Sequence, residues 1–436
     1  MTVLWTLLTL GALAAPTPQI PVAEHRLENG LTVLLSEDHR LPVVAVEVRY
    51  LVGSAHEVTG RTGFAHLFEH LMFQGSVNYD DEYFKPLEPI GARVNGTTST
   101  DRTNYYEQVP SQYLERVLWL ESDRMESLLG VLTQAKLDNQ RDVVKNERRQ
   151  NYEDRPYGLA FKHLANNLFP KGHPYHHLPI GSHADLTAAS LDDVRAFFKR
   201  YYCPANAIIT ITGDFDSKET LGMVERYFGD IAPGKRAPKP VAPPVKLSAT
   251  SHLRDTDEVP LPRIYLSWPA PALYAQGDAG LDILASVLST GKASRLYHRL
   301  VYSSRVAKDV SAYQVSRQLD SFFVVQATAA PGRTTEELAK ELLAALKDAL
   351  ATPPTKDEFE RALNGWRKSF FSRMESVLRK ATLLSGYKHL TGDANYIGKD
   401  LARYTSLNPE AVHETAKHWL NLSAYVRVDI TPKAGK

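Results

Sequence analysis

The chain has 436 residues and a formal net charge of +1, with 51 Lys and Arg residues against 50 Asp and Glu residues. This balance argues against nucleic acid or an anionic membrane as the main partner. The length provides for two or more domains. The single cysteine, Cys203, excludes an internal disulfide and a cysteine-based zinc site.

The N-terminus is typical of a secretory signal. Residues 3–12 form an apolar run that leads into Ala12-Leu13-Ala14, a small-x-small cleavage pattern. The run is too short for an ordinary transmembrane helix. We therefore expect a signal peptide over residues 1–15 and a periplasmic or secreted protein without stable membrane insertion. No Lys or Arg precedes the run, so a buried strand or an anchor is the alternative.

The first half of the mature chain mixes strand and helix signals. Residues 27–35 predict two strands around an Asn-Gly turn, and residues 43–51 predict a third. The Thr- and Tyr-rich segment 91–107 predicts a β-hairpin. The other predicted elements of this half are helices over 111–129, 133–152 and 191–201 and a strand over 207–212.

A proline-rich stretch begins at residue 233, and after it the order of elements restarts with a strand over 263–268 and an apolar helix over 279–288. This restart predicts a duplication. We expect an N-terminal domain over 21–233, a linker over 234–258 and a C-terminal domain over 259–436.

The segment His66-Leu67-Phe68-Glu69-His70 follows the third predicted strand and has the H-x-x-E-H spacing of one class of zinc peptidases. Its apolar flanks predict a helix, on which His66 and His70 lie one turn apart and can hold one ion. Glu69 can then hold and deprotonate a metal-bound water. The alternative is a structural histidine pair, but burying Glu69 there without a metal is costly.

Zinc hydrolases usually use three protein ligands and leave a fourth position for water. A third donor is therefore needed. Glu147, on the helix predicted over 133–152, is a candidate. Spacing alone does not select it from the other acidic residues nearby.

Five further stretches follow a recognisable order along the chain. They are Gly53-Ser54-Ala55-His56-Glu57, residues 95–105, Asp142-Val143-Val144-Lys145-Asn146-Glu147, Tyr201-Tyr202-Cys203-Pro204 and Gly213-Asp214. Together with the H-x-x-E-H motif they resemble the M16 metallopeptidases, the family of pitrilysin, insulin-degrading enzyme and the mitochondrial processing peptidase. Gly96 stands where that family usually has Ala.

The resemblance implies an α/β (α+β) fold of two similar domains, each a mixed β-sheet with helices packed on one face. It also implies a zinc metalloendopeptidase that hydrolyses peptides or unfolded polypeptides, with one Zn2+ per chain on His66, His70 and Glu147 and with Glu69 as the general base. Peptide substrates are expected to add a strand to a sheet edge. The edge residues implied are Asn95, Gly96, Thr97 and Thr98.

Two departures from the family bear on partners. Gln140 replaces a Glu that many members have seven residues before the third ligand, and we assign it an orienting role only. The family's second domain usually carries an Arg, and a Tyr seven residues later, that hold the substrate. Val301 and Lys308 occupy those positions here, although Arg299, Tyr302 and Arg305 lie close by.

We therefore expect the catalytic subunit of a two-chain assembly, in which a related M16-type chain supplies the Arg and Tyr. A homodimer is the alternative arrangement. A non-catalytic core or assembly subunit is the alternative function, and a zinc hydrolase of another class is a further one. The intact zinc motif argues against a scaffold, which has no need of an open metal position.

Overall fold

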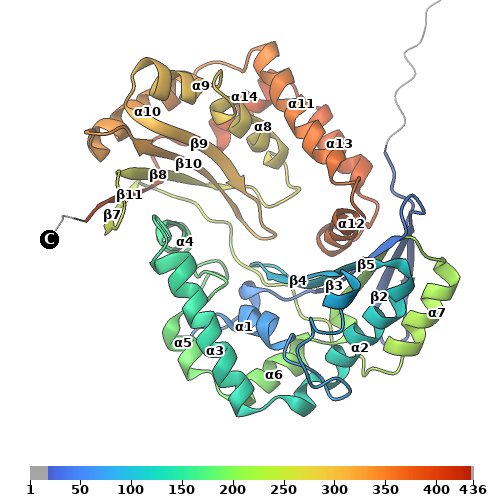
Figure 1. The fold of residues 1–436 in the computed structure, drawn as a ribbon. Helices are drawn as coiled ribbons and strands as arrows, with labels where there is room; N and C mark the ends of the chain where they lie inside the picture. Colours follow the sequence, from blue (N-terminus) through green and yellow to red (C-terminus); the bar gives the residue numbers. More distant parts are fainter. Residues whose placement is uncertain (1–17, 434–436) are drawn as a thin grey trace, which may run out of the picture.

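The computed structural model describes residues 18–433, so the predicted signal peptide over 1–15 lies outside the described residues. The chain forms two β-sheets, one from each half, with helices layered against them (Figure 1). Both sheets are mixed, as predicted. None of the described helices has the length and apolar character needed to cross a membrane.

The first sheet has six strands in the order β1-β2-β6-β3-β5-β4. Only β2 and β6 run parallel, and the other neighbours are antiparallel. β4 forms one edge and pairs with β5 alone. The strands are β1 Ala23–Arg26, β2 Thr32–Glu37, β3 Val43–Tyr50, β4 Arg93–Thr98, β5 Thr103–Pro110 and β6 Ala207–Gly213.

One face of this sheet shares a hydrophobic core with several helices. Alternate residues of β3, such as Val46 and Val48, point into this core and meet Leu67 and Phe68 of the first helix. The helices of this half are α1 Phe64–Leu71, α2 Leu114–Val131, α3 Gln134–Arg148, α4 Ala160–Leu168, α5 His183–Ala188, α6 Leu191–Tyr201 and α7 Ser217–Phe228. A π-turn over Arg149–Glu153 continues α3.

The second sheet has five strands in the order β7-β11-β8-β10-β9, with β7 and β11 parallel. β7 falls inside the stretch 234–258 that was expected to be a linker. The strands are β7 Ser251–Asp257, β8 Arg263–Ala270, β9 Ala307–Val315, β10 Ser321–Ala329 and β11 Val426–Pro432.

Most helices of the second half pack on one face of this sheet, around the buried side chains of Trp268 and Phe323. The helices of this half are α8 Asp278–Ser289, α9 Arg295–Tyr297, α10 Thr335–Ala349, α11 Lys356–Ser372, α12 Val377–Thr391, α13 Ile397–Thr405 and α14 Pro409–Trp419.

The two halves repeat one local design. α1 follows β3 and starts after Gly63, whose φ is 92°, while α8 follows β8 and starts after Gly277, whose φ is 95°. Only glycine adopts such angles without strain. The helix α8 contains no histidine, so the second copy of the design has no counterpart of His66 and His70.

Two shared cores join the halves at opposite ends. α12, from the second half, lies on the face of the first sheet away from α1, where Leu384 and Tyr387 pack with Leu34 and Ile208 (Figure 1). At the other end α4, from the first half, contacts β8 and β11 of the second sheet. The two halves are therefore joined at both ends by contacts within one chain.

Candidate metal centre

The helix α1 presents His66, Glu69 and His70 on one side because its apolar side is fixed. Leu67, Phe68 and Leu71 are buried in the first core, whereas the three polar side chains are half-buried. The face between α3 and β4 is the one left to them, since α1 contacts both elements.

The start of α1 is held by Glu57, the last residue of the Gly53–Glu57 stretch. The backbone N–H groups of Gly63 and Ala65 donate to its carboxylate at 2.9 and 2.8 Å. This contact satisfies two of the unpaired donors at the helix start. The imidazole of His177 lies 3.0 Å from the same carboxylate. Glu57 and His177 therefore position the helix without touching the cluster, a role that motif reading alone did not assign.

His66, His70 and Glu147 converge although α1 and α3 are far apart in sequence. Oε2 of Glu147 lies 3.6 Å from Nε2 of His66 and 3.2 Å from Nε2 of His70. One donor atom from each residue lies within 4.8 Å of the others, and no other such group of three occurs in residues 18–433. Asn151 donates to the second oxygen of Glu147 at 3.2 Å and orients it.

The electrostatics of the cluster suit a cation. Burial, and then the neighbouring His70, lower the pKa of His66 to about 4. A hydrogen bond from His70 lowers the pKa of Glu147. Near neutral pH, His66 is therefore a neutral imidazole and Glu147 a carboxylate, the forms that bind metals. Two imidazole nitrogens and one carboxylate oxygen are a donor set that fits zinc and leaves a position for water.

Glu69 lies beside the cluster and against β4. A Cβ atom added at Gly96 would lie only 3.0 Å from Cγ of Glu69, so the glycine lets the strand pack directly on this side chain. Oε2 of Glu69 is buried and has no hydrogen-bond partner among the described residues. Burial raises the pKa of Glu69, which makes its carboxylate a stronger proton acceptor.

The four residues predicted to bind substrate lie on β4, at the edge of the first sheet. Asn95 is exposed, Gly96 is buried, and Thr97 and Thr98 are half-buried. The side chain of Asn95 accepts a hydrogen bond from the Gly96 N–H at 2.8 Å. Since β4 has a strand on one side only, its other edge can accept an added strand.

A buried ion network lies beneath this hairpin. Arg124 of α2 is 1% exposed and donates to Glu121 at 2.9 Å and to Glu107 of β5 at 3.3 Å. The hydroxyl of Tyr83 donates to the same Glu107 oxygen at 2.9 Å. The guanidinium also lies 4.4 Å from the ring centre of Tyr105. That ring is one of the three groups packed against Gly96, so the network supports the strand beside Glu69.

A cavity of about 670 Å3 adjoins the cluster and lies between the two halves of the chain. Its wall from the first half includes His66, Thr98 and Glu147, and its wall from the second half includes Arg263 and Arg317. The cavity therefore gives a ligand access to the cluster from the interior of the chain.

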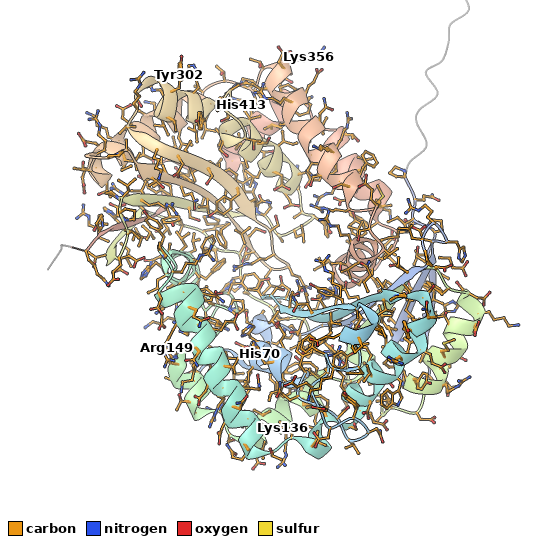
Figure 2. The ribbon with its side chains drawn as sticks, viewed as in Figure 1. His70, Lys136, Arg149, Tyr302, Lys356 and His413 are labelled. Atoms are coloured by element: carbon orange, nitrogen blue, oxygen red, sulfur yellow. The ribbon has the colours of Figure 1, made fainter. Side chains whose placement is uncertain are left out.

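The residues that depart from the family pattern lie away from this cavity. Gln140 is buried on α3 and donates to Asn139 at 2.9 Å. Val301 packs against the second core, and Lys308 is exposed on β9. None of the three lines the cavity. Tyr302 lies on the outer surface of the second half, far from His70 (Figure 2).

Comparisons with known proteins agree with this architecture. Residues 32–178 match the family described as insulinase (peptidase family M16), and residues 188–365 match the peptidase M16 inactive domain. The zinc protease PqqE of Helicobacter pylori is 30% identical over 387 residues, which cover 87% of this chain and 86% of that protein. The uncharacterized zinc protease YmxG of Bacillus subtilis is 22% identical over 91% of this chain and 95% of its own length.

A solved structure gives the same result. The crystal structure of a protease from Helicobacter pylori has a TM-score of 0.87 and 28% sequence identity, and the match covers 95% of this chain and 100% of that chain.

Proposed function

Because this chain belongs to peptidase family M16, we propose that it is a zinc endopeptidase acting on peptides or unfolded polypeptides. The observation that carries the proposal is the convergence of His66, His70 and Glu147 beside Glu69 and a free strand edge. A scaffold subunit has no use for such a grouping.

His66, His70 and Glu147 would hold one Zn2+, which when bound lowers the pKa of a coordinated water and polarises the scissile carbonyl. Glu69 is the proton carrier of the reaction. Its buried Oε2 accepts the proton of the attacking water and later delivers it to the leaving amine. Asn151 keeps the Glu147 carboxylate in position through its second oxygen.

The peptide substrate pairs with the outer edge of β4 along Asn95, Gly96, Thr97 and Thr98. Main-chain hydrogen bonds of this kind are indifferent to most side chains, which suits a peptidase with broad specificity. The close packing of Gly96 on Glu69 then brings a peptide bond of the added strand near the general base.

The assembly proposed is a pair of related chains in the periplasm or outside the cell. Val301 and Lys308 stand where the family usually has Arg and Tyr, which supports a partner chain that supplies these two residues. A homodimer is the alternative, and it is the outcome if the purified chain alone is fully active.

The experiment compares Glu69→Gln, His66→Ala, Glu147→Gln and the control Asp142→Asn, an exposed acid on the same helix as Glu147. Zinc content and cleavage of a quenched fluorescent peptide are measured for the chain alone and with a related chain encoded beside it. We expect Glu69→Gln to keep zinc and lose turnover about 10²–10⁴-fold. His66→Ala and Glu147→Gln should lose zinc. Full activity of Glu69→Gln would refute the assignment of the base.

A further inference from the structure

A second cavity, of about 620 Å3, lies between the first sheet and the helices α11 and α12. We call it the arginine cavity, because five of its described lining residues are arginines and none is acidic. The arginines are Arg49, Arg93, Arg102, Arg373 and Arg379. Such a concentration of one charge is unusual in a chain whose formal net charge is +1.

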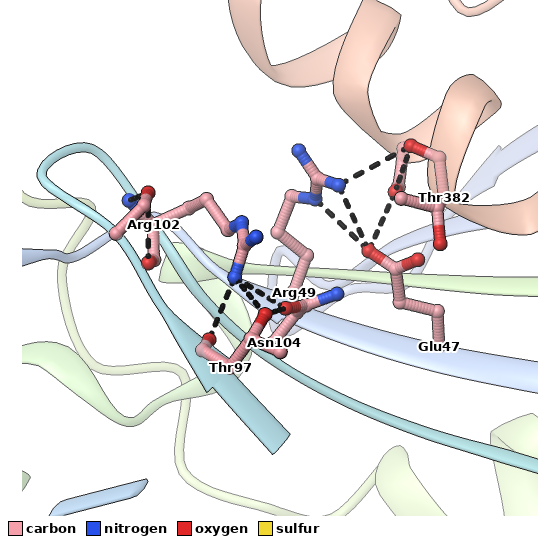
Figure 3. A network of polar contacts seen from close by, with 8 residues as sticks. Glu47, Arg49, Thr97, Arg102, Asn104 and Thr382 are labelled. Carbon is pink, nitrogen blue, oxygen red and sulfur yellow. Dashed lines mark hydrogen bonds and ion pairs between the residues drawn. The ribbon is translucent and has the colours of Figure 1, made fainter. Parts of the chain in front are cut away.

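One of the five arginines is neutralised within the protein. Arg49 is buried and pairs with Glu47 at 3.0 Å, and it also donates to the Thr382 carbonyl of α12 at 3.2 Å (Figure 3). Ser385 donates to the same Glu47 carboxylate at 2.8 Å. This pair joins the sheet to α12, so its role is structural.

The other four arginines form no close ion pair with a carboxylate of the described residues. Within residues 18–433, no carboxylate oxygen lies within 4.0 Å of the side-chain nitrogens of Arg93, Arg102, Arg373 or Arg379, although other arginines of the chain form such pairs. Arg93, Arg373 and Arg379 are exposed to the solvent of the cavity. Like charges facing one another across a cavity repel, so a bound anion would relieve this repulsion.

The guanidinium of Arg102 is fixed in a position from which it can bind such an anion. Its Nη1 donates to the Thr97 carbonyl at 2.7 Å and to the Asn104 side chain at 2.6 Å (Figure 3). All its hydrogen bonds to described residues leave from Nη1. Nε and Nη2 therefore remain available as donors, and the fixed guanidinium loses little freedom when it binds.

The register of the sheet connects this cavity to the substrate edge. Arg93, Asn95 and Thr97 of β4 lie opposite Gln108, Tyr106 and Asn104 of β5, respectively. Gly96 faces Glu69, so the residues that alternate with it, including Arg93 and Thr97, face the other way, toward the arginine cavity. A strand added at the edge of β4 keeps this alternation.

We propose that the arginine cavity is a subsite for acidic side chains on every second residue of the substrate strand. This inference rests on the proposed function, because it assumes that the substrate pairs with β4. Side chains on one face of that strand point toward Glu69 and the metal cluster. Those on the other face meet Arg93 and Arg102 on the sheet, and Arg373 and Arg379 on the opposite wall.

The test uses four amidated, quenched fluorescent peptides with one cleavable core. They carry Glu at alternate positions in one phase, Glu shifted by one residue, Gln in place of Glu, or Glu in both phases. We expect one phase of Glu to raise kcat/KM about threefold to tenfold over Gln, and the shifted phase to give no gain. Added salt should reduce the gain, since the pairs are partly solvated.

Variants then assign the preference to the cavity. Arg93→Gln/Arg379→Gln should bring the Glu-to-Gln ratio of kcat/KM close to one, whereas the control Arg333→Gln, an exposed arginine outside the cavity, should keep it. The thermal midpoint and circular dichroism of each variant establish that it is folded. A ratio that the double variant leaves unchanged overturns the proposal.

A measurement of peptide binding distinguishes a failure of the subsite from a failure of the proposed function. The anisotropy of labelled Glu and Gln peptides is measured on the same preparations. Cleavage without preference for Glu leaves the peptidase assignment standing and removes the subsite. Tighter binding of the in-phase Glu peptide, without any cleavage by the chain alone or with the related chain added, supports the subsite and refutes the peptidase. Equal binding of both peptides overturns the subsite whether or not they are cleaved.

Discussion

Replacing Arg124 by Met tests the ion network under the substrate edge. The substitution nearly conserves length but removes the positive charge between Glu107 and Glu121, both of which are fully buried. Burial already raises the pKa of Glu107 well above its ordinary value. Arg124 is the ion partner of Glu121. Without it we expect the carboxyl of Glu121 to become neutral in the folded variant at neutral pH, in addition to the proton that Glu107 already binds more readily in the parent.

The free-energy cost of the neutral carboxyl follows from the difference between its pKa values in the folded and unfolded states. A carboxyl with a pKa of 4.5 in the unfolded chain costs about 3.4 kcal/mol to keep neutral at about pH 7, because each pH unit is worth about 1.36 kcal/mol. We therefore expect Arg124→Met to lower the free energy of unfolding by about 3–5 kcal/mol. A raised folded pKa destabilises only above the unfolded pKa, so this part of the loss should fall to about 0.7 kcal/mol near pH 5.

Urea unfolding followed by circular dichroism, for variant and parent at each pH between about 5 and 8, measures this difference. The control Arg116→Met changes an exposed arginine on the same helix and should cost under about 0.5 kcal/mol. Adding Glu107→Gln and Glu121→Gln to Arg124→Met should recover much of the loss at neutral pH. A large loss that does not change with pH would refute the reasoning, since it would point to lost packing alone.

Three further predictions concern other parts of the chain. Gly96→Ala places a Cβ atom 3.0 Å from Glu69 and 3.1 Å from Phe73. Because this contact displaces the general base, kcat in a peptide assay should fall about threefold to thirtyfold. The control Gly222→Ala has open space around the added Cβ and should keep activity. Arg295 lowers the pKa of Glu358 to about 2, which stabilises the fold above the unfolded pKa of 4.5. Glu358→Gln should therefore lower the free energy of unfolding in urea by about 1–3 kcal/mol at neutral pH, and the difference from the parent should disappear as the pH falls toward 2. A chelator should lower the thermal midpoint of the parent, and zinc should restore it, but neither should move that of His66→Ala.

Much of the fold could be predicted because its signals are local. The helix over residues 191–201 is found at those bounds as α6, where Ser190 caps it and Asp193 completes the capping box. The strand β7 was not predicted, because Ser251–Asp257 is mostly polar and half-exposed. It is a strand only through its pairing with β11, which lies near the other end of the chain.

The residues of the candidate site also differ in whether local sequence patterns predict them. His66, Glu69 and His70 are carried by one helical turn, so their spacing alone suggests a metal. Glu147 required the family resemblance, since many acidic residues surround it in sequence. Asn151 lies one turn beyond Glu147 on the same helical stretch. Glu57 and His177 reach the site from separate segments, and local patterns contain nothing that brings these two together. The arginine cavity likewise draws its residues from strands and helices of both halves.

The attachment of α12 and α4 at opposite ends has a consequence for how a substrate enters. Separating the two halves of the chain would expose Leu384 and Tyr387 at one end, and the surfaces of α4, β8 and β11 at the other. Both seams combine an apolar core with polar contacts, such as that of Arg49 with the Thr382 carbonyl and that of His163 with Asp255, so parting them would resemble partial unfolding. We therefore expect the two halves of one chain to stay together, so that a long polypeptide enters past the edge of the cavity or when the two chains of the proposed pair separate.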